Sequence, residues 1–101
     1  MRIEIFVCET ANPTEKEFLL LEGAKGILIS AFKGLTEVPF VGYSKDRKGN
    51  VEIDTGKIWL IYTDLAERYF KRGLKHAVKQ IKTATKQTSQ MYTINNKAYF
   101  I

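Results

Sequence analysis

The sequence predicts an α+β domain in which two helices cover one face of an antiparallel β-sheet. Three observations lead to this prediction. Apolar and polar residues alternate near the N-terminus, which is the pattern of a strand with one buried face. Two longer stretches repeat apolar residues every three or four positions, as amphipathic helices do. The other apolar runs are short and bounded by turn residues, which is typical of strands.

The first strand is expected over Arg2–Glu9, where apolar and polar side chains alternate. The residues that would share its buried face are Ile3, Ile5 and Val7. An Ala-Asn-Pro sequence at residues 11–13 then breaks the pattern and ends the strand.

Residues from about 15 to 33 are expected to form the first helix. Thr14 and Glu17 have the spacing of a capping box, and apolar residues follow at helical intervals. Gly23 and Gly26 oppose this prediction, because each costs about 1 kcal/mol relative to Ala inside a helix. A β-hairpin that turns at these glycines is therefore the alternative structure for this segment.

The middle of the chain indicates two strands joined by a polar turn. Val38–Ser44 is the first, with Pro39 near its start, where a missing N–H is tolerated. The turn follows in the sequence SKDRKGN, and Val51–Thr63 forms the second strand. The apolar positions of this second strand change phase around Gly56, so we expect a β-bulge there.

Asp64 is expected to cap a second helix that runs to about residue 86. Residues 90–101 would form a strand or a tight hairpin that turns at Asn95-Asn96. The order strand, helix, strand, strand, helix, strand is that of the ferredoxin-like βαββαβ sandwich, which has two helices on one face of its sheet. We expect residues 1–101 to form one such domain.

The composition limits the classes of function. With 45% hydrophobic and 27% charged residues, the chain is expected to be globular rather than disordered. No apolar run has the length of a membrane-spanning helix, and the N-terminus lacks the pattern of a signal peptide. Cys8 is the only cysteine, which excludes an intrachain disulfide and a zinc site with several thiolates. We expect a cytoplasmic protein without a metal or cofactor.

The charge is distributed unevenly. Residues 1–67 carry eight Lys/Arg and eleven acids, a net of −3, whereas residues 68–101 carry eight Lys/Arg and no acid, which gives the chain its +5. On a helical wheel, seven of these cations share one face of the expected second helix: Arg68, Lys71, Arg72, Lys75, Lys79, Lys82 and Lys86. We call this set the basic stripe.

The basic stripe has two interpretations. A merely solvated face usually mixes Glu with Lys, because like charges at i,i+4 destabilise a helix by about 0.2–0.5 kcal/mol per pair. An unmixed stripe instead favours an anionic ligand. The stripe would extend roughly 27 Å along the helix, enough for about four to six phosphates. A second, weaker basic cluster lies in the expected turn between the middle strands: Lys45, Arg47 and Lys48.

Phe6 and Trp59 are out of phase with the expected core residues of their strands. Both are therefore candidates for the open face of the sheet, where aromatic side chains stack on unpaired bases. The alternative is that the C-terminal strands cover them, or that Trp59 belongs to a two-sided core.

Around these aromatics the chain resembles an RNA-recognition motif, in which such side chains stack on the bases of RNA. Ile5-Phe6-Val7 is similar to the start of the motif's first-strand hexamer, and the sequence TGKIWLIY is similar to its third-strand octamer. The octamer positions that match are Gly56, Trp59, Leu60 and Tyr62. The positions that depart from the motif are Lys57, in place of the second stacking aromatic, Ile58, in place of a small residue, and Glu9-Thr10, in place of Asn-Leu.

Residues with catalytic potential are few, and we expect no enzyme. His76 is the only histidine and lies beside the basic stripe with no acid to orient it. Cys8 lacks the electropositive setting that activates a thiolate. Glu52 and Asp54, with Lys57, have only a partial likeness to the acid–lysine cluster of metal-dependent nucleases.

The expected function is binding of nucleic acid, DNA or RNA, through phosphate contacts of the basic stripe and possible stacking on the sheet. The alternative is a protein-interaction or inhibitor domain, of the kind that phages and mobile elements encode. Such a domain would dock its basic face on an acidic or nucleic-acid-binding surface of a larger protein. Either function requires an anionic partner for the second helix.

Overall fold

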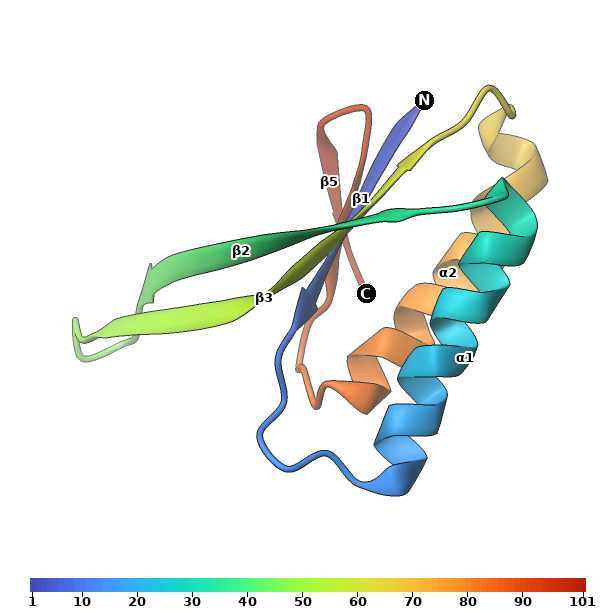
Figure 1. The fold of residues 1–101 in the computed structure, drawn as a ribbon. Helices are drawn as coiled ribbons and strands as arrows, with labels where there is room; N and C mark the ends of the chain where they lie inside the picture. Colours follow the sequence, from blue (N-terminus) through green and yellow to red (C-terminus); the bar gives the residue numbers. More distant parts are fainter.

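The computed structural model describes residues 1–101, and its chain folds into five strands and two helices. The elements in order are β1 (Arg2–Cys8), α1 (Glu15–Phe32), β2 (Thr36–Lys45), β3 (Val51–Tyr62), α2 (Glu67–Ala84), β4 (Met91–Ile94) and β5 (Lys97–Phe100). Figure 1 shows α1 and α2 side by side on one face of a strongly twisted sheet. Neither helix combines the length and apolar character that a membrane-spanning helix requires.

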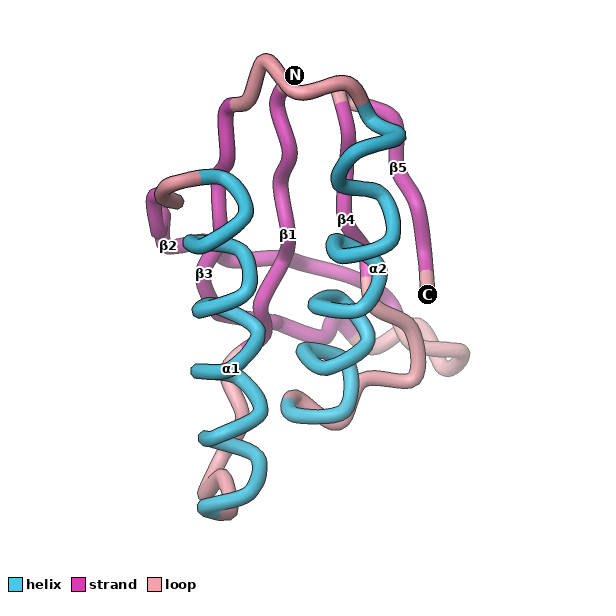
Figure 2. The backbone as a smooth tube through the Cα atoms, turned by 90° about the vertical axis from the view of Figure 1, so that its right-hand side faces the viewer, coloured by secondary structure: helices cyan, strands magenta, loops and turns pink.

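The strand order β2-β3-β1-β4-β5, with every neighbouring pair antiparallel, confirms the ferredoxin-like arrangement. Figure 2, turned by 90°, shows both helices in front of the sheet. The C-terminal segment forms the hairpin alternative rather than one strand, because Asn95 and Asn96 both adopt positive φ, 50° and 68°. Asparagine tolerates this left-handed backbone, which a tight two-residue hairpin turn requires.

The first helical segment is a helix and not a hairpin, because its start is well capped. The Thr14 side chain accepts a hydrogen bond from the Glu17 amide at 3.1 Å, and the Glu17 carboxylate accepts one from the Thr14 amide at 2.8 Å. The helix continues through Gly23 and Gly26 and ends at Phe32, where Lys33 caps it with a left-handed φ of 70°. Packing of α1 against α2, with Ala24 and Leu28 buried in the core, thus outweighs the two glycines.

The second helix differs from the prediction at both ends. It begins after Ala66, which makes no side-chain cap, so Asp64 is not the capping residue. It ends at Ala84, two residues before the expected boundary. The Thr85 hydroxyl donates to the Ile81 carbonyl at 2.7 Å, which competes with continuation of the helix.

The core lies between the sheet and the two helices. Its sheet side consists of Ile3, Ile5 and Val7 of β1, Trp59 and Ile61 of β3, and Tyr92 and Ile94 of β4. The prediction that Trp59 lies on the open face of β3, out of phase with the core, is therefore wrong. Ile5 pairs directly with Trp59, and residues that pair directly share a face, so Trp59 points to the helices. Ile58 and Leu60 occupy the open face and are half-buried.

The outer half of the β2–β3 hairpin projects beyond the helices as a two-stranded arm (Figure 1). Four large side chains are exposed on one face of this arm: Val41, Tyr43, Val51 and Ile53. Val51 and Ile53 of this set lie an even number of residues from Trp59 and Ile61, so they share one face of β3 and the apolar phase does not change. The ladder between β2 and β3 runs through Gly56 without an extra residue, so the expected β-bulge is absent.

Gly56 has a different role from the predicted one. It pairs with Cys8 on one side and Phe40 on the other, so it lies at the crossing of β1, β3 and β2. A Cβ atom there would overlap the carbonyl oxygen of Val7 and lie 2.9 Å from the Cα atom of Cys8. Only glycine permits this close approach of two backbones.

Replacing Gly56 with Ala should therefore lower the free energy of unfolding by about 2–3 kcal/mol, because backbone atoms must move to admit the methyl group. Gly26→Ala is the matched control, since nothing lies within 4 Å of its added Cβ. That change should raise the free energy of unfolding by about 0.5–1 kcal/mol through helix propensity. Urea unfolding followed by circular dichroism measures both free energies. Equal stabilities of the Gly56 variant and the parent would show that the backbones at Gly56 do not approach too closely for a Cβ atom.

Candidate functional site

The basic stripe forms on the exposed side of α2, except at its C-terminal end. Of the six members within the helix, five are exposed and Lys82 is half-buried. None of these six lies within ion-pair distance of an acid, since the four ion pairs in the molecule involve other cations or Lys86. Lys86 follows the helix at a φ of 55° and pairs with Glu17 at 3.5 Å. Lys86 was predicted to be part of the basic stripe, but it forms an ion pair within the molecule instead.

The weaker basic cluster is not brought to the stripe. Lys45, Arg47 and Lys48 lie at the tip of the arm, on the opposite side of the molecule from α2 (Figure 1). The Asp46 carboxylate accepts hydrogen bonds from the amides of Lys48 and Asn50, each at 2.9 Å, and shapes this turn. The two clusters cannot act as one continuous surface.

The predicted aromatic platform does not exist. Trp59 is 2% exposed on the helix side of the sheet, whereas Phe6 lies on the open side. Phe6 packs edge-on against Phe40, with ring centroids 5.7 Å apart. The likeness to an RNA-recognition motif therefore fails at the residue that would have to stack on a base.

The partial nuclease motif is also not assembled. Glu52 and Asp54 lie on the open face of the arm, and Lys57, an odd number of residues away, lies on the other face. No three carboxylate, histidine or cysteine side chains gather in a way that could hold a metal ion. His76 is exposed on α2 and contacts Gln80 at 3.1 Å.

A cavity of about 420 Å³, which the sequence analysis did not predict, opens on the helix side of the sheet. The end of β1, the first turns of α1, the edge strand β2 and the end of α2 surround it. Its polar lining consists of Cys8, Glu9, Thr10, Glu17, Glu22, Lys25, Glu37, Lys57 and Thr85, and its apolar lining includes Val7, Pro13, Phe18, Leu21, Trp59 and Ala84. We call it the acidic pocket, because glutamates outnumber lysines in the lining.

Glu37 of β2 is the most strongly held carboxylate in the pocket. It receives the Lys25 ammonium at 2.7 Å, the Lys57 ammonium at 3.4 Å and the indole N–H of Trp59 at 3.2 Å. The hydrogen bond from Lys25 is the main reason that the pKa of Glu37 falls below its ordinary value of 4.5. Pairing between β2 and β3 puts Glu37 opposite Trp59, which explains their contact.

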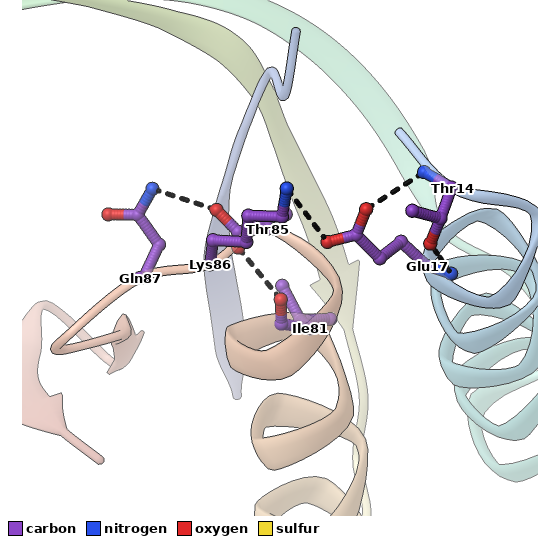
Figure 3. Close-up of polar contacts among 6 residues, drawn as sticks. All are labelled: Thr14, Glu17, Ile81, Thr85, Lys86 and Gln87. Carbon is purple, nitrogen blue, oxygen red and sulfur yellow. Dashed lines mark hydrogen bonds and ion pairs between the residues drawn. The ribbon is translucent and has the colours of Figure 1, made fainter. Parts of the chain in front are cut away.

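The start of α1 and the end of α2 meet at the rim of the pocket (Figure 3). Glu17 serves both, as the capping-box partner of Thr14 and as the ion-pair partner of Lys86. The backbone hydrogen bond from Thr14 is the main reason that the pKa of Glu17 is lowered. Glu17 is therefore ionised and already partnered.

Two glutamates of the pocket remain without an ion pair. They are Glu9, which accepts a hydrogen bond from the Thr55 hydroxyl at 3.1 Å, and Glu22 on α1. The Thr10 hydroxyl beside them is buried and has no hydrogen-bond partner. The pKa of the Cys8 thiol is raised by burial and secondarily by Asp54, so this side chain stays a neutral thiol. The pocket thus offers carboxylates and a free hydroxyl, but no nucleophile.

Glu37→Gln should reduce the free energy of unfolding at pH 7, because it removes the charge that Lys25 and Lys57 bind. A carboxyl with a lowered pKa stabilises the fold above its unfolded pKa, near 4.5, and this contribution is lost as the pH falls through the lower folded pKa. The difference in the free energy of unfolding between the parent and Glu37→Gln should therefore shrink from pH 6 towards pH 3.

Chemical unfolding across this pH range measures the effect. Glu52→Gln on the arm is the matched control, since Glu52 forms no ion pair. A difference between the parent and Glu37→Gln that stays constant down to pH 3 would show that the lysines do not bind a charged Glu37.

No protein-family model matches this sequence, and no curated protein matches it either. Among solved structures, it is similar to a phage SAM lyase. The structure of that lyase in complex with S-methyl-5'-thioadenosine superposes with a TM-score of 0.62 at 18% identity, over 99% of this chain and 87% of the lyase. Its apo structure gives a TM-score of 0.65 at 17% identity, over 99% and 86%.

This likeness establishes a shared fold. It also corrects the expectation that the chain is not an enzyme, because the solved structures that it resembles are those of an enzyme. That expectation rested on the small number of side chains with catalytic potential. That argument fails for reactions in which the substrate supplies its own reacting groups, since the protein then needs only to bind and orient it.

Proposed function

We propose that the acidic pocket binds S-adenosylmethionine and that the protein cleaves it as a lyase, with release of S-methyl-5'-thioadenosine. The phage enzyme of the same fold supports the proposal by its substrate and by the nucleoside bound to it. The observation that carries it is the excess of carboxylates in the pocket. The volume of about 420 Å³ also falls in the range usual for small-molecule sites.

The charges of the pocket complement those of S-adenosylmethionine. The ligand carries two positive groups, the sulfonium and the ammonium, and one negative group, the carboxylate. The pocket presents four glutamates against two lysines, and Lys86 neutralises Glu17 at the rim, which leaves one negative charge in excess. Glu9 and Glu22 are free to face the positive groups, and Lys25 and Lys57 can hold the carboxylate.

The apolar lining suits the adenine ring. Phe18 of α1 is 54% exposed at the pocket, although a side chain of this size is usually covered in a small domain. Stacking of the adenine on Phe18 would bury the phenyl ring, and the complex would gain the contact energy usual for a pair of aromatic rings. The unpartnered Thr10 hydroxyl can serve a ribose or adenine polar atom, which would remove the cost of leaving it unsatisfied.

Cleavage of the sulfonium needs no protein nucleophile. The substrate carboxylate attacks Cγ of its own methionine part, and the electron pair of the S–Cγ bond leaves with the sulfur. The sulfur becomes the neutral thioether of S-methyl-5'-thioadenosine, and the remaining atoms close a five-membered lactone. One positive and one negative charge disappear in this step, so a site that holds the two groups together and excludes water favours it.

The test is incubation of the purified protein with S-adenosylmethionine and detection of S-methyl-5'-thioadenosine by mass spectrometry. Glu9→Gln with Glu22→Gln should raise KM by about tenfold or more, since two charge-assisted contacts are lost. The matched control is Glu52→Gln with Asp54→Asn, which removes the same charge from the open face of the arm. Its KM should equal that of the parent protein.

Absence of product, together with no heat of binding for either S-adenosylmethionine or S-methyl-5'-thioadenosine, would overturn the proposal. Equal effects of the pocket and arm variants would also contradict it, because net charge and not the pocket would then govern binding.

A further inference from the structure

The geometry of α2 points to a second binding surface: we propose that its basic stripe, without Lys86, binds the phosphate backbone of a nucleic acid. This surface is independent of the acidic pocket. The helix contributes only its end, Ala84 and Thr85, to the pocket, while the stripe lies on the exposed side of the preceding turns. The same helix thus separates an acidic cavity from a basic exterior.

The six cations form a row along one face of α2. Arg68 and Lys82 mark its ends, fourteen residues apart within one uninterrupted helix, which corresponds to roughly 21 Å. The buried residues Phe70, Leu74, Ala77, Val78, Ile81 and Ala84 fix the opposite face against the core. The row therefore cannot rotate away from solvent without loss of the core. A rigid, linear array of charges matches a ligand whose charges also repeat along a line.

None of these six cations forms an ion pair within the fold, because the acids of the molecule lie elsewhere. Glu17 and Glu22 of the neighbouring α1 face the pocket, and the C-terminal strands carry no acid at all. Lys86, which does find an acid, shows that the chain can neutralise a cation in this region. An external anion is the remaining partner for the six others.

The chemistry of the row favours phosphates over other anionic surfaces. Four of the six cations are lysines, which act as point charges and accept any approach direction. At the start of the row, Arg68 contacts Tyr69, with its guanidinium 4.7 Å from the ring centroid and its Nη2 at 3.0 Å from the phenol oxygen. Tyr69 is 68% exposed and offers an unpaired base a surface for stacking. Such an aromatic beside a phosphate track is typical of single-strand binding.

The decisive measurement is fluorescence anisotropy with labelled oligonucleotides of about 20 nucleotides, single-stranded and duplex, between about 50 and 200 mM KCl. Four engaged phosphates predict a slope of log K against log salt of roughly −3 to −4. Lys75→Glu with Lys79→Glu should weaken binding at least about tenfold and bring the slope closer to zero by about two. Cleavage of S-adenosylmethionine should be unchanged in this variant, so failure of either proposal is distinguishable from failure of the other.

The matched control is Lys45→Glu with Lys48→Glu at the arm tip, which makes the same change of net charge far from α2. It should bind oligonucleotides nearly as the parent does, and circular dichroism should show both variants folded. Equal weakening by the two variants would overturn the proposal, because total charge would then explain binding. No binding of either oligonucleotide would overturn it too. If poly-L-glutamate then bound with the same sensitivity to Lys75→Glu and Lys79→Glu, the stripe would be a docking face for an acidic protein.

Discussion

The register between β1 and β3 determines most of the remaining structure. Because Ile5 stands opposite Trp59, the indole enters the core under the helices and not the open face of the sheet. The next pair on that face, Val7 and Lys57, sends the lysine to the same side. Glu37, opposite Trp59 on β2, then meets both the indole and the ammonium. The close approach at Gly56 holds this register, since a displaced strand would bring a side chain against the backbone of β1.

The fold could be predicted from local patterns, and the pocket could not. The capping box at Thr14 and the amphipathic second helix are encoded within a few residues, and both are present, although the second helix begins and ends at other residues than expected. The face of Trp59 depends on pairing with a strand more than fifty positions away. Its immediate neighbours Ile58 and Leu60 are apolar as well, so alternation alone did not decide which face Trp59 occupies, although Val51 and Ile53 share the face of Trp59.

The pocket residues escaped the sequence analysis for the same reason. Glu9, Glu17, Glu22 and Glu37 come from a loop, a helix and an edge strand, and each has an ordinary local role as a surface or capping acid. Only their meeting around Trp59 makes them a site. The basic stripe needed no tertiary information, because its six retained members lie on one helix. Its last member, Lys86, left the stripe because the helix ends at Ala84 and the chain turns back to Glu17.

The molecule thus carries two surfaces of opposite sign, an acidic cavity and a basic helix face, and the central claim concerns the cavity. Trp59 is the only tryptophan, and its indole N–H points at Glu37 beside the pocket, so its NMR resonance is an unambiguous reporter. Titration with S-methyl-5'-thioadenosine should shift this resonance and those of pocket amides, while an oligonucleotide should shift α2 amides and leave the indole unchanged. An indole resonance that does not move at saturating nucleoside would contradict the account.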